Sequence, residues 1–402
     1  LSQSFISTRR RISSLRTLLI WPRIKHRMTN MIHSNSKYTC LVSAVVALSA
    51  LSVQAQESVS IESLLREMVN RDKVARYPKA NFRLKQDSSY DRSSKTPDDP
   101  EGWFSNFDRS TSDKHVNFIR TEQNNGRKEW VVMEDEGPGV ITRIWVPWRN
   151  QLQPGTDVVI RFYLDDASEP TIEGNMFELF QGTGLVPPPL GHESLRSAVS
   201  FFPIPYAKSC KVTMSDHPIF FQFTYREYIE EVDVETFSIE GFRSAKPSIA
   251  ATCDALQNPD KPPAGDVVKL KESIDVGLEL SMSLPEGAAA VRSLSLSLGS
   301  YENAEVTRQV VLKMSFDNKQ TVWCPIGDFF GSGIGLNPFQ GWYRSVDADG
   351  TMTSRWVMPY QSKAKVSIVN LGKDPVDVEV SAAVGDWKWD SSSMYFHSGW
   401  RG

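Results

Sequence analysis

One polar segment of this chain brings together residue types that could bind a sugar. Asp91 is followed directly by Arg92, and a carboxylate beside a guanidinium offers acceptors and donors to sugar hydroxyls as well as an ordinary ion pair. Trp103 lies farther along the segment, and its flat apolar ring could stack on the C–H face of a sugar. The segment predicts a carbohydrate-binding loop, with simple anchoring of the loop by the tryptophan as the alternative. The candidate binding residues are Ser89, Asp91, Arg92, Trp103, Asn106 and Asp108.

Carboxyl groups are plentiful, but their spacing singles out no catalytic pair. Hydrolysis of a glycosidic bond uses two carboxyl groups, about 5 to 5.5 Å apart for retention of configuration and about 6.5 to 9.5 Å apart for inversion. The acidic run Glu-Asp-Glu at 134–136 precedes Gly-Pro-Gly at 137–139, and we interpret it as a solvated turn rather than as a general acid or base. No catalytic residue is therefore assigned from the sequence.

The sequence contains no motif that is typical of a metal or cofactor site. The histidines after residue 55 have no metal-like partner two to four positions away, and the cysteines there are widely spaced and odd in number. No phosphate-binding or dinucleotide-binding glycine motif stands between a strand and a helix. The expectation is a protein without metal or cofactor. The residues concerned are His115, His192, His217, His397, Cys210, Cys253 and Cys324.

The elements that must position the candidate loop are mostly strands. A helix is expected from Ile61, with Ser60 as its N-cap, because apolar residues recur at helical spacing until Pro78. From Asn117 onward, short runs rich in Val, Ile and aromatic residues alternate with Gly, Pro and Asp, which is typical of an all-β sandwich or barrel. A proline-rich stretch at 251–266 is the best candidate for a linker between two such domains.

Residues 1–55 have the composition of a targeting segment. They contain eight Lys and Arg and no Asp or Glu, and a basic patch leads into the apolar run CLVSAVVALSALSV and a small-x-Ala motif. We expect a signal peptide cleaved near Ala55, preceded by a doubtful upstream extension, and a secreted or periplasmic bacterial protein. Without this segment, the chain has 37 basic and 48 acidic residues, which gives a net charge of about −11. Nucleic acid and anionic membranes are therefore poor partners.

Two parts of the chain repeat each other. RFYLDDASEPTIEGNMFELFQG, from Arg161, and VLKMSFDNKQTVWCPIGDFFG, from Val311, align so that Glu178 matches Asp328 and Asp166 matches Asp317. The Pro-Tyr pairs at 205–206 and 359–360 continue the alignment in the same order. A duplicated β domain explains this pattern, and the recurrence of Glu178 and Asp328 favours a structural role for them, such as accepting backbone N–H bonds at a turn. The predicted fold is all-β, with tandem jelly-roll β-sandwiches and a short N-terminal amphipathic helix.

Seven short segments, in order along the chain, resemble glycoside hydrolase family 172, the former domain of unknown function 2961. They are EMVNRDKVARYP, QDSSYDR, GPGVITRIWV, RFYLDD, PIGDFFGSG, MPY and YFHSGWR, between Glu67 and Arg401. The resemblance implies a double jelly roll that assembles as trimers or hexamers and acts on fructofuranosides and arabinofuranosides. One departure is that Arg92 is followed by SSKTPDDPEGWFSN in place of the family's glycine-asparagine pair, which puts the pocket rim in doubt.

The resemblance also places the family's two catalytic glutamates after the FHxxWR-like segment, on a further jelly roll beyond residue 402. The predicted function is therefore the N-terminal portion of a long, secreted glycoside hydrolase-like protein acting on furanosides. A non-catalytic carbohydrate-binding or assembly protein built of jelly rolls is the alternative. The expected layout is signal peptide and extension at 1–55, helix and long loop at 56–112, first jelly roll at 113–250, linker at 251–266, second jelly roll at 267–395, and the start of a catalytic domain at 396–402.

Overall fold

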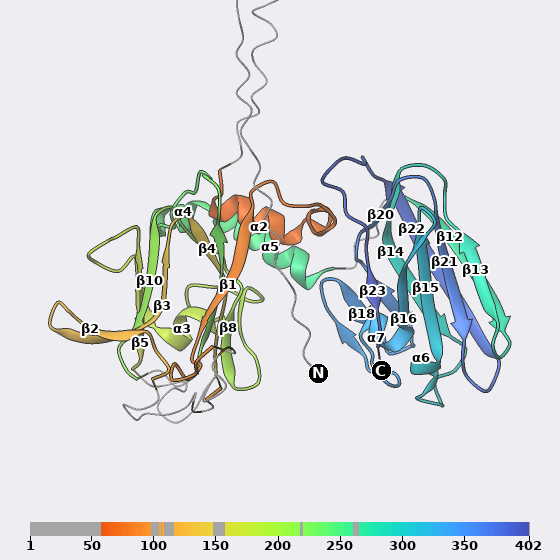
Figure 1. The fold of residues 1–402 in the computed structure, drawn as a ribbon, viewed down its shortest axis with the longest axis horizontal. Helices are drawn as coiled ribbons and strands as arrows, with labels where there is room; N and C mark the ends of the chain where they lie inside the picture. The colour runs from red at the N-terminus through yellow and green to blue at the C-terminus, as the bar shows by residue number, and fades with distance from the viewer. Residues whose placement is uncertain are drawn as a thin grey trace, which may run out of the picture. The chain divides into compact units, whose positions relative to one another are not determined.

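The computed structural model is built of antiparallel sheets with a few short helices (Figure 1). It describes residues 58–96, 98, 104, 105, 107, 116–147, 157–217, 220–259 and 265–401. The predicted signal peptide and extension at 1–55 lie outside these residues. Four sheets form two sandwiches, and each sandwich has its own apolar core.

The first sandwich packs two sheets around a core of buried aromatic and aliphatic side chains, among them Phe162, Phe180 and Phe202. One sheet has the order β1-β11-β4-β8-β7, with β9 also paired to β4. Its strands are β1 (Phe82–Ser88), β4 (Gly139–Pro147), β7 (Gly191–Glu193), β8 (Ser197–Ser200), β9 (Ile204–Tyr206) and β11 (Gln222–Tyr228). The facing sheet has the order β2-β3-β10-β5-β6. Its strands are β2 (Arg120–Asn124), β3 (Arg127–Glu136), β5 (Val159–Leu164), β6 (Ile172–Asn175) and β10 (Ser209–Met214).

The second sandwich repeats this arrangement with the same kind of core. One sheet runs β12-β22-β14-β19-β18-β17, with β20 paired to β14, and the other runs β13-β21-β15-β16-β23. The first comprises β12 (Asp266–Ile274), β14 (Ala289–Leu298), β17 (Phe339–Gln340), β18 (Arg344–Val346), β19 (Met352–Ser354), β20 (Met358–Tyr360) and β22 (Val376–Asp386). The second comprises β13 (Glu279–Ser283), β15 (Val310–Phe316), β16 (Lys319–Pro325), β21 (Ala364–Asn370) and β23 (Ser398–Gly399).

The strand pairing of both sandwiches is that of a jelly roll. In the first, β1 pairs with β11, β3 with β10, β4 with β8 and β5 with β6. In the second, β12 pairs with β22, β13 with β21, β14 with β19 and β15 with β16. Strands from the beginning of each domain sequence thus pair with strands from its end, and the strands between them pair with one another. This is the pairing of a long hairpin that is rolled up into two sheets. The predicted fold of tandem jelly rolls is confirmed by this topology.

The duplication extends to local structure, with one shift of register. The short helices α3 (Met176–Phe180) and α7 (Ile326–Phe330) occupy equivalent places after β6 and β16. Asp165 and Asp166 have φ of 52° and 61°, and Asp317 and Asn318 have φ of 49° and 68°, so both copies turn through two left-handed residues. The equivalent of Asp317 is therefore Asp165, not Asp166 as the sequence alignment suggested.

These two turn aspartates hold the same neighbouring segment in each copy. Asp317 accepts hydrogen bonds from the backbone N–H groups of Gln361 (2.7 Å), Ser362 (2.7 Å) and Lys363 (3.0 Å). Asp165 accepts from those of Lys208 (2.6 Å) and Ser209 (3.3 Å) in the equivalent segment after β9. The recurring turn aspartate is thus a structural acceptor.

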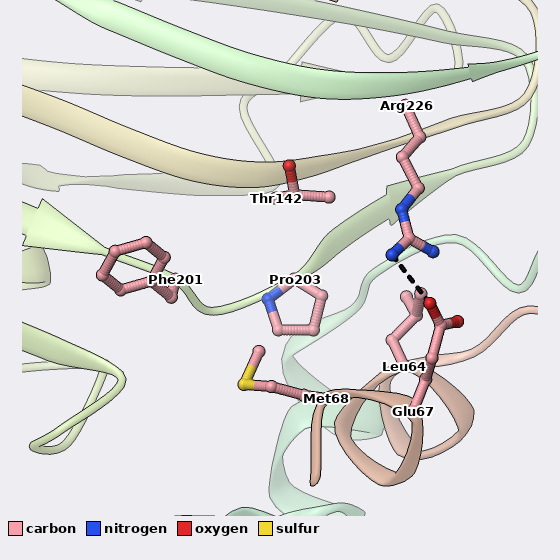
Figure 2. A pocket seen from close by; sticks show the side chains of 7 residues that line it. All are labelled: Leu64, Glu67, Met68, Thr142, Phe201, Pro203 and Arg226. Carbon is pink, nitrogen blue, oxygen red and sulfur yellow. Dashed lines mark hydrogen bonds and ion pairs between the residues drawn. The ribbon is translucent and has the colours of Figure 1, made fainter. Parts of the chain in front are cut away.

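The N-terminal helix is shorter than predicted. Ser60 caps α2 (Ile61–Val69) in a reciprocal pair with Ser63, but the helix stops at Asn70, whose side chain accepts from the next turn and begins a 3₁₀ helix, η1 (Arg71–Ala75). Local competition by an Asn side chain therefore ends α2 before Pro78 is reached. Leu64 and Met68 of α2 lie against the outer face of the first sheet (Figure 2).

Two parts of the expected layout differ in the structure. Residues 82–88, placed in a long loop from the sequence, form the edge strand β1, so the first sandwich begins inside the predicted segment 56–112. Helices α4 (Ile239–Ser244) and α5 (Lys246–Gln257) follow β11, so the first part of the stretch 251–266 is helical rather than a linker. One further helix, α6 (Val306–Gln309), precedes β15. The domain boundaries themselves remain a prediction.

Candidate functional site

The candidate carbohydrate-binding loop starts where β1 ends, and Asp91 is buried inside it. Asp91 is 1% exposed. Its Oδ1 accepts from the backbone N–H (3.0 Å) and hydroxyl (2.6 Å) of Ser93, and its Oδ2 accepts from the hydroxyl of Ser105 (2.5 Å) and the N–H of Phe107 (3.2 Å). Four donors of the loop itself therefore occupy the carboxylate. The geometry gives Asp91 the task of holding the loop together.

Ser89 and Arg92, the other described candidates, have different environments. Ser89 is 7% exposed and exchanges hydrogen bonds with the backbone of Phe221, so it fixes the loop to the strand beside it. The Arg92 guanidinium lies 4.7 Å from the centre of the Tyr90 ring and donates to the carbonyl of Ser88. Burial lowers the pKa of Arg92, while Tyr90 and Asp87 oppose that effect. Arg92 and Tyr90 thus form one guanidinium-aromatic pair.

Three aromatic side chains of the loop are exposed. Tyr90, Phe104 and Phe107 are 53%, 66% and 55% exposed. Aromatic faces of this kind can take the C–H side of a sugar ring, with Arg92 able to donate to hydroxyls. Of the predicted set, Trp103, Asn106 and Asp108 lie outside the described residues.

A charged cluster supports the base of this loop, where strands of the two facing sheets meet. Lys85 of β1 lies 2.9 Å from Glu227 of β11 and 3.8 Å from Asp135 of β3. The hydroxyl of Tyr206, from β9, donates to Asp135 Oδ2 at 2.8 Å. Asp87 of β1 accepts from the backbone N–H of Glu134 at 3.1 Å, which joins the edges of the two sheets. We refer to Lys85, Asp87, Asp135, Tyr206 and Glu227 as the edge cluster.

Burial has the largest effect on the pKa values of Asp135 and Asp87 in the edge cluster. Desolvation raises the pKa of Asp135 to about 6, and the Tyr206 hydrogen bond and Lys85 oppose it only in part. Desolvation also raises the pKa of Asp87. For Lys85, the hydrogen bond to Glu227 raises the pKa above its ordinary value. A carboxyl with a pKa near 6 beside other carboxylates is a common feature of glycosidase acids.

The position of Asp135 argues against direct catalysis despite this titration. Asp135 is 5% exposed, and its neighbours Tyr206 and Cys210 are among the buried residues of the core. A general acid must come within hydrogen-bond distance of the reacting oxygen. The edge cluster therefore joins the two sheets next to the loop through Asp87 and Glu134, and burial lowers the pKa of Arg92 while the charge of Asp87 raises it.

Sequence reasoning missed most of the edge cluster. Lys85 and Asp87 stand two residues apart in FRLKQDS, a period-2 signal of a strand edge, but the run lacks apolar alternation. The run 134–136 was interpreted as a solvated turn, whereas it is the end of β3 and its middle residue points inward. The Asx-turn pattern of Asp91 and Ser93 was the available signal for the structural role of Asp91.

Comparison with protein families gives two matches that together cover most of the described chain. Residues 80–245 match the GH172 first beta-sandwich domain, and residues 266–382 match the GH172 domain-like model. The chain belongs to glycoside hydrolase family 172. The GH172 match to residues 80–245 includes β1, the candidate loop and the edge cluster. The resemblance drawn from short motifs is confirmed.

Other comparisons add little to the GH172 assignment. No curated protein matches the chain. The major capsid protein P2 from bacteriophage PM2 is 7% identical over 69% of this chain and 97% of its own, with a TM-score of 0.20. The CBM32-1 and CBM32-2 domains from Clostridium perfringens ZmpB are 9% identical over 78% and 96%, with a TM-score of 0.15. These TM-scores are too low to support an argument about this chain.

Three further properties concern the described part of the GH172 chain only. Within it, no group of three or more His, Cys, Asp and Glu side chains is arranged to hold a metal ion. Its helices include none that is long and apolar enough to cross a membrane. The three described cysteines are buried and unpaired with one another.

Proposed function

We propose that this chain recognises furanosides for a secreted glycoside hydrolase and binds them at the loop that follows β1. The observation that carries the proposal is the match of two consecutive parts of the chain to GH172 models. The exposed rings of Tyr90, Phe104 and Phe107 beside Arg92 support the placement of the sugar. In this proposal the chain is exported by a signal peptide ending near Ala55 and assembles as a trimer or hexamer.

The test is a binding titration of the purified chain with fructofuranosyl and arabinofuranosyl oligosaccharides, with isomeric pyranosides as a comparison. Replacing Arg92 by Ala removes the guanidinium donors, and we expect Kd for the furanosides to rise about tenfold. Tyr77→Ala is the matched control, because Tyr77 is 61% exposed and lies outside the loop. Absence of furanoside binding, or equal loss in both variants, would contradict the proposal.

Hydrolysis of the same sugars tests whether this chain also cleaves what it binds. The edge cluster offers a carboxyl of raised pKa but keeps it from a substrate, which favours recognition over cleavage by these residues. Binding with no release of free sugar would agree both with the recognition role and with the non-catalytic carbohydrate-binding alternative. Release that survives Asp135→Asn would show that cleavage depends on other residues.

A further inference from the structure

The first sheet presents polar and aromatic side chains on the face that points away from its core. Ile144 and Val146 of β4 are buried in the core, so Arg143 and Trp145, which alternate with them, lie on the outer face. The same alternation places every second residue of β1 and β11 on that face. We define the outer patch as the members of this set that lie beside the candidate loop. They are Gln86, Ser88, Arg143, Trp145, Gln222 and Thr224.

One row of the outer patch begins at the candidate loop. Ser88, the last residue of β1, stands opposite Gln222 of β11, which stands opposite Trp145 of β4. Tyr90 of the loop follows Ser88 by two residues. Two strand spacings of about 4.8 Å place Trp145 roughly 10 Å from Ser88 along this row. The loop and the half-buried Trp145 ring are therefore parts of one continuous surface.

The second row supplies hydrogen-bonding groups beside the first. Gln86 stands opposite Thr224, and Thr224 stands opposite Arg143. The Arg143 guanidinium donates to Gln222 Oε1 at 2.8 Å. The Thr224 hydroxyl donates to Gln86 Oε1 at 3.2 Å. Each amide keeps its NH2 group as a donor after accepting such a bond. Gln86 is exposed and the other residues of this row are half-buried, so solvent reaches the row.

Helix α2 lies against the outer face on the side away from the loop. Arg226 follows Thr224 by two residues on β11 and forms an ion pair with Glu67 of α2 at 2.7 Å. Leu64 and Met68 of the same helix line a small pocket of about 120 Å³ together with this arginine (Figure 2). The outer patch therefore extends from the loop to a fixed end at α2, where the charges of Glu67 and Arg226 already neutralise each other.

The residue types of the outer patch suit a neutral sugar chain. The Trp145 ring can stack on the C–H face of a sugar, and the amides and the Arg143 guanidinium can bond to hydroxyls. None of the patch residues is acidic. We propose that the outer patch binds the successive units of a furanoside oligosaccharide whose first unit is held at the loop.

The length of the outer patch predicts a preference for long ligands. A single sugar ring held beside Tyr90 is too short to reach Trp145, whereas a chain of several units spans the roughly 10 Å between Ser88 and Trp145. Affinity should therefore increase with chain length. The inference rests on the function proposed above and names the ligand as a chain of furanosyl units rather than one sugar.

The test compares the affinity of the purified chain for a furanosyl disaccharide and for the hexasaccharide of the same linkage. The wild-type chain should bind the hexasaccharide about tenfold more tightly. Trp145→Ala should remove that gain and leave Kd for the disaccharide unchanged. Equal affinity for the two lengths would overturn this inference and leave the function proposed for the loop standing. Binding of neither sugar would overturn the proposed function, and this inference with it.

A second variant and a control separate loss of contact from loss of fold. Because Trp145 is half-buried, its replacement could also disturb the sheet, whereas Gln86 is exposed on the edge strand. Gln86→Ala should raise Kd for the hexasaccharide about fivefold and spare the disaccharide. Trp323→Ala is the matched control, since Trp323 is 36% exposed on β16 of the second sandwich, and it should change neither Kd. Unchanged hexasaccharide binding in both patch variants, or an equal loss in the control, would contradict the proposal.

Discussion

Asp135 shows that a carboxyl group can have the raised pKa of a catalytic acid although its role is structural. Its carboxyl accepts from Tyr206 and lies 3.8 Å from Lys85, yet burial outweighs both and raises its pKa to about 6. In the unfolded chain an aspartate titrates near 3.9. The folded protein therefore binds a proton more tightly than the unfolded chain between about pH 4 and pH 6. Stability that comes from this group is present at low pH and is lost as the pH rises through 6.

We predict that Asp135→Asn raises the free energy of unfolding at pH 7 by about 1 to 2 kcal/mol. The amide cannot ionise, but its oxygen can still accept from Tyr206. Urea denaturation at pH 4.5 and pH 7.5 would measure the effect, which should be small at the lower pH. Glu136→Gln, a change at the exposed neighbour, serves as control. A variant that is less stable than the wild type at pH 7.5 would show that the ionised carboxylate is needed for the fold.

The candidate loop could be located from the sequence, but the roles within it could not. Asp91 and Arg92 are adjacent in the chain, which predicted an ion pair or a joint sugar site. In the structure the carboxylate turns inward to Ser93 and Ser105, while the guanidinium lies over Tyr90. Residue types indicate what a side chain can bond to, but the direction of each side chain depends on partners distant in sequence.

At the scale of elements, alternation of apolar residues located most strands, and β1 is the informative exception. β1 is the edge strand of its sheet and, among the described strands, pairs only with β11. Its Leu84 side chain faces solvent and is 65% exposed, while Lys85 points toward the facing sheet. Because every residue of β1 is exposed or half-buried, the strand has no period-2 apolar pattern. Helix α5 was missed for a related reason, because its apolar face is narrow and includes Thr252.

The repeated turns give a prediction about the second sandwich. Asp317 accepts three backbone hydrogen bonds and others from Ser362 and Tyr395. Burial would raise the pKa of Asp317, but these hydrogen bonds outweigh it and lower the pKa below its ordinary value. We predict that Asp317→Ala lowers the free energy of unfolding by about 2 to 3 kcal/mol at pH 7.

Chemical denaturation at pH 7 and near pH 3 would measure the effect of Asp317→Ala. The loss should shrink as the pH falls, because an acid with a lowered pKa stabilises the fold above its unfolded pKa and loses that contribution on protonation. Asp349→Ala is a suitable control, since Asp349 caps an exposed turn through Thr351. A loss of less than about 0.5 kcal/mol, or equal losses in both variants, would show that the recurring aspartate is not a structural acceptor of consequence.

At the scale of the whole molecule, the duplication was readable from the sequence because the same contacts are made twice. The turn aspartate, the short helix after β6 or β16 and the Pro-Tyr strand occupy equivalent places in both sandwiches. Because these residues make the same contacts within each copy, they are the same in both copies. The repeat is therefore visible in the sequence even where the surfaces of the two sandwiches differ. The segment 70–77 has no counterpart in the repeat. It joins the second sandwich through Arg71 at Trp342 and Arg76 at Trp387.

The central claim is that a GH172 chain of two jelly rolls recognises furanosides at the loop after β1. Hydrogen exchange of the purified chain, with and without saturating arabinofuranosyl or fructofuranosyl oligosaccharide, tests it most directly. We predict slower exchange in peptides that contain Tyr90 and Arg92, with no change in the second sandwich. Protection confined to the second sandwich, or the same protection with an isomeric pyranoside, would contradict the account.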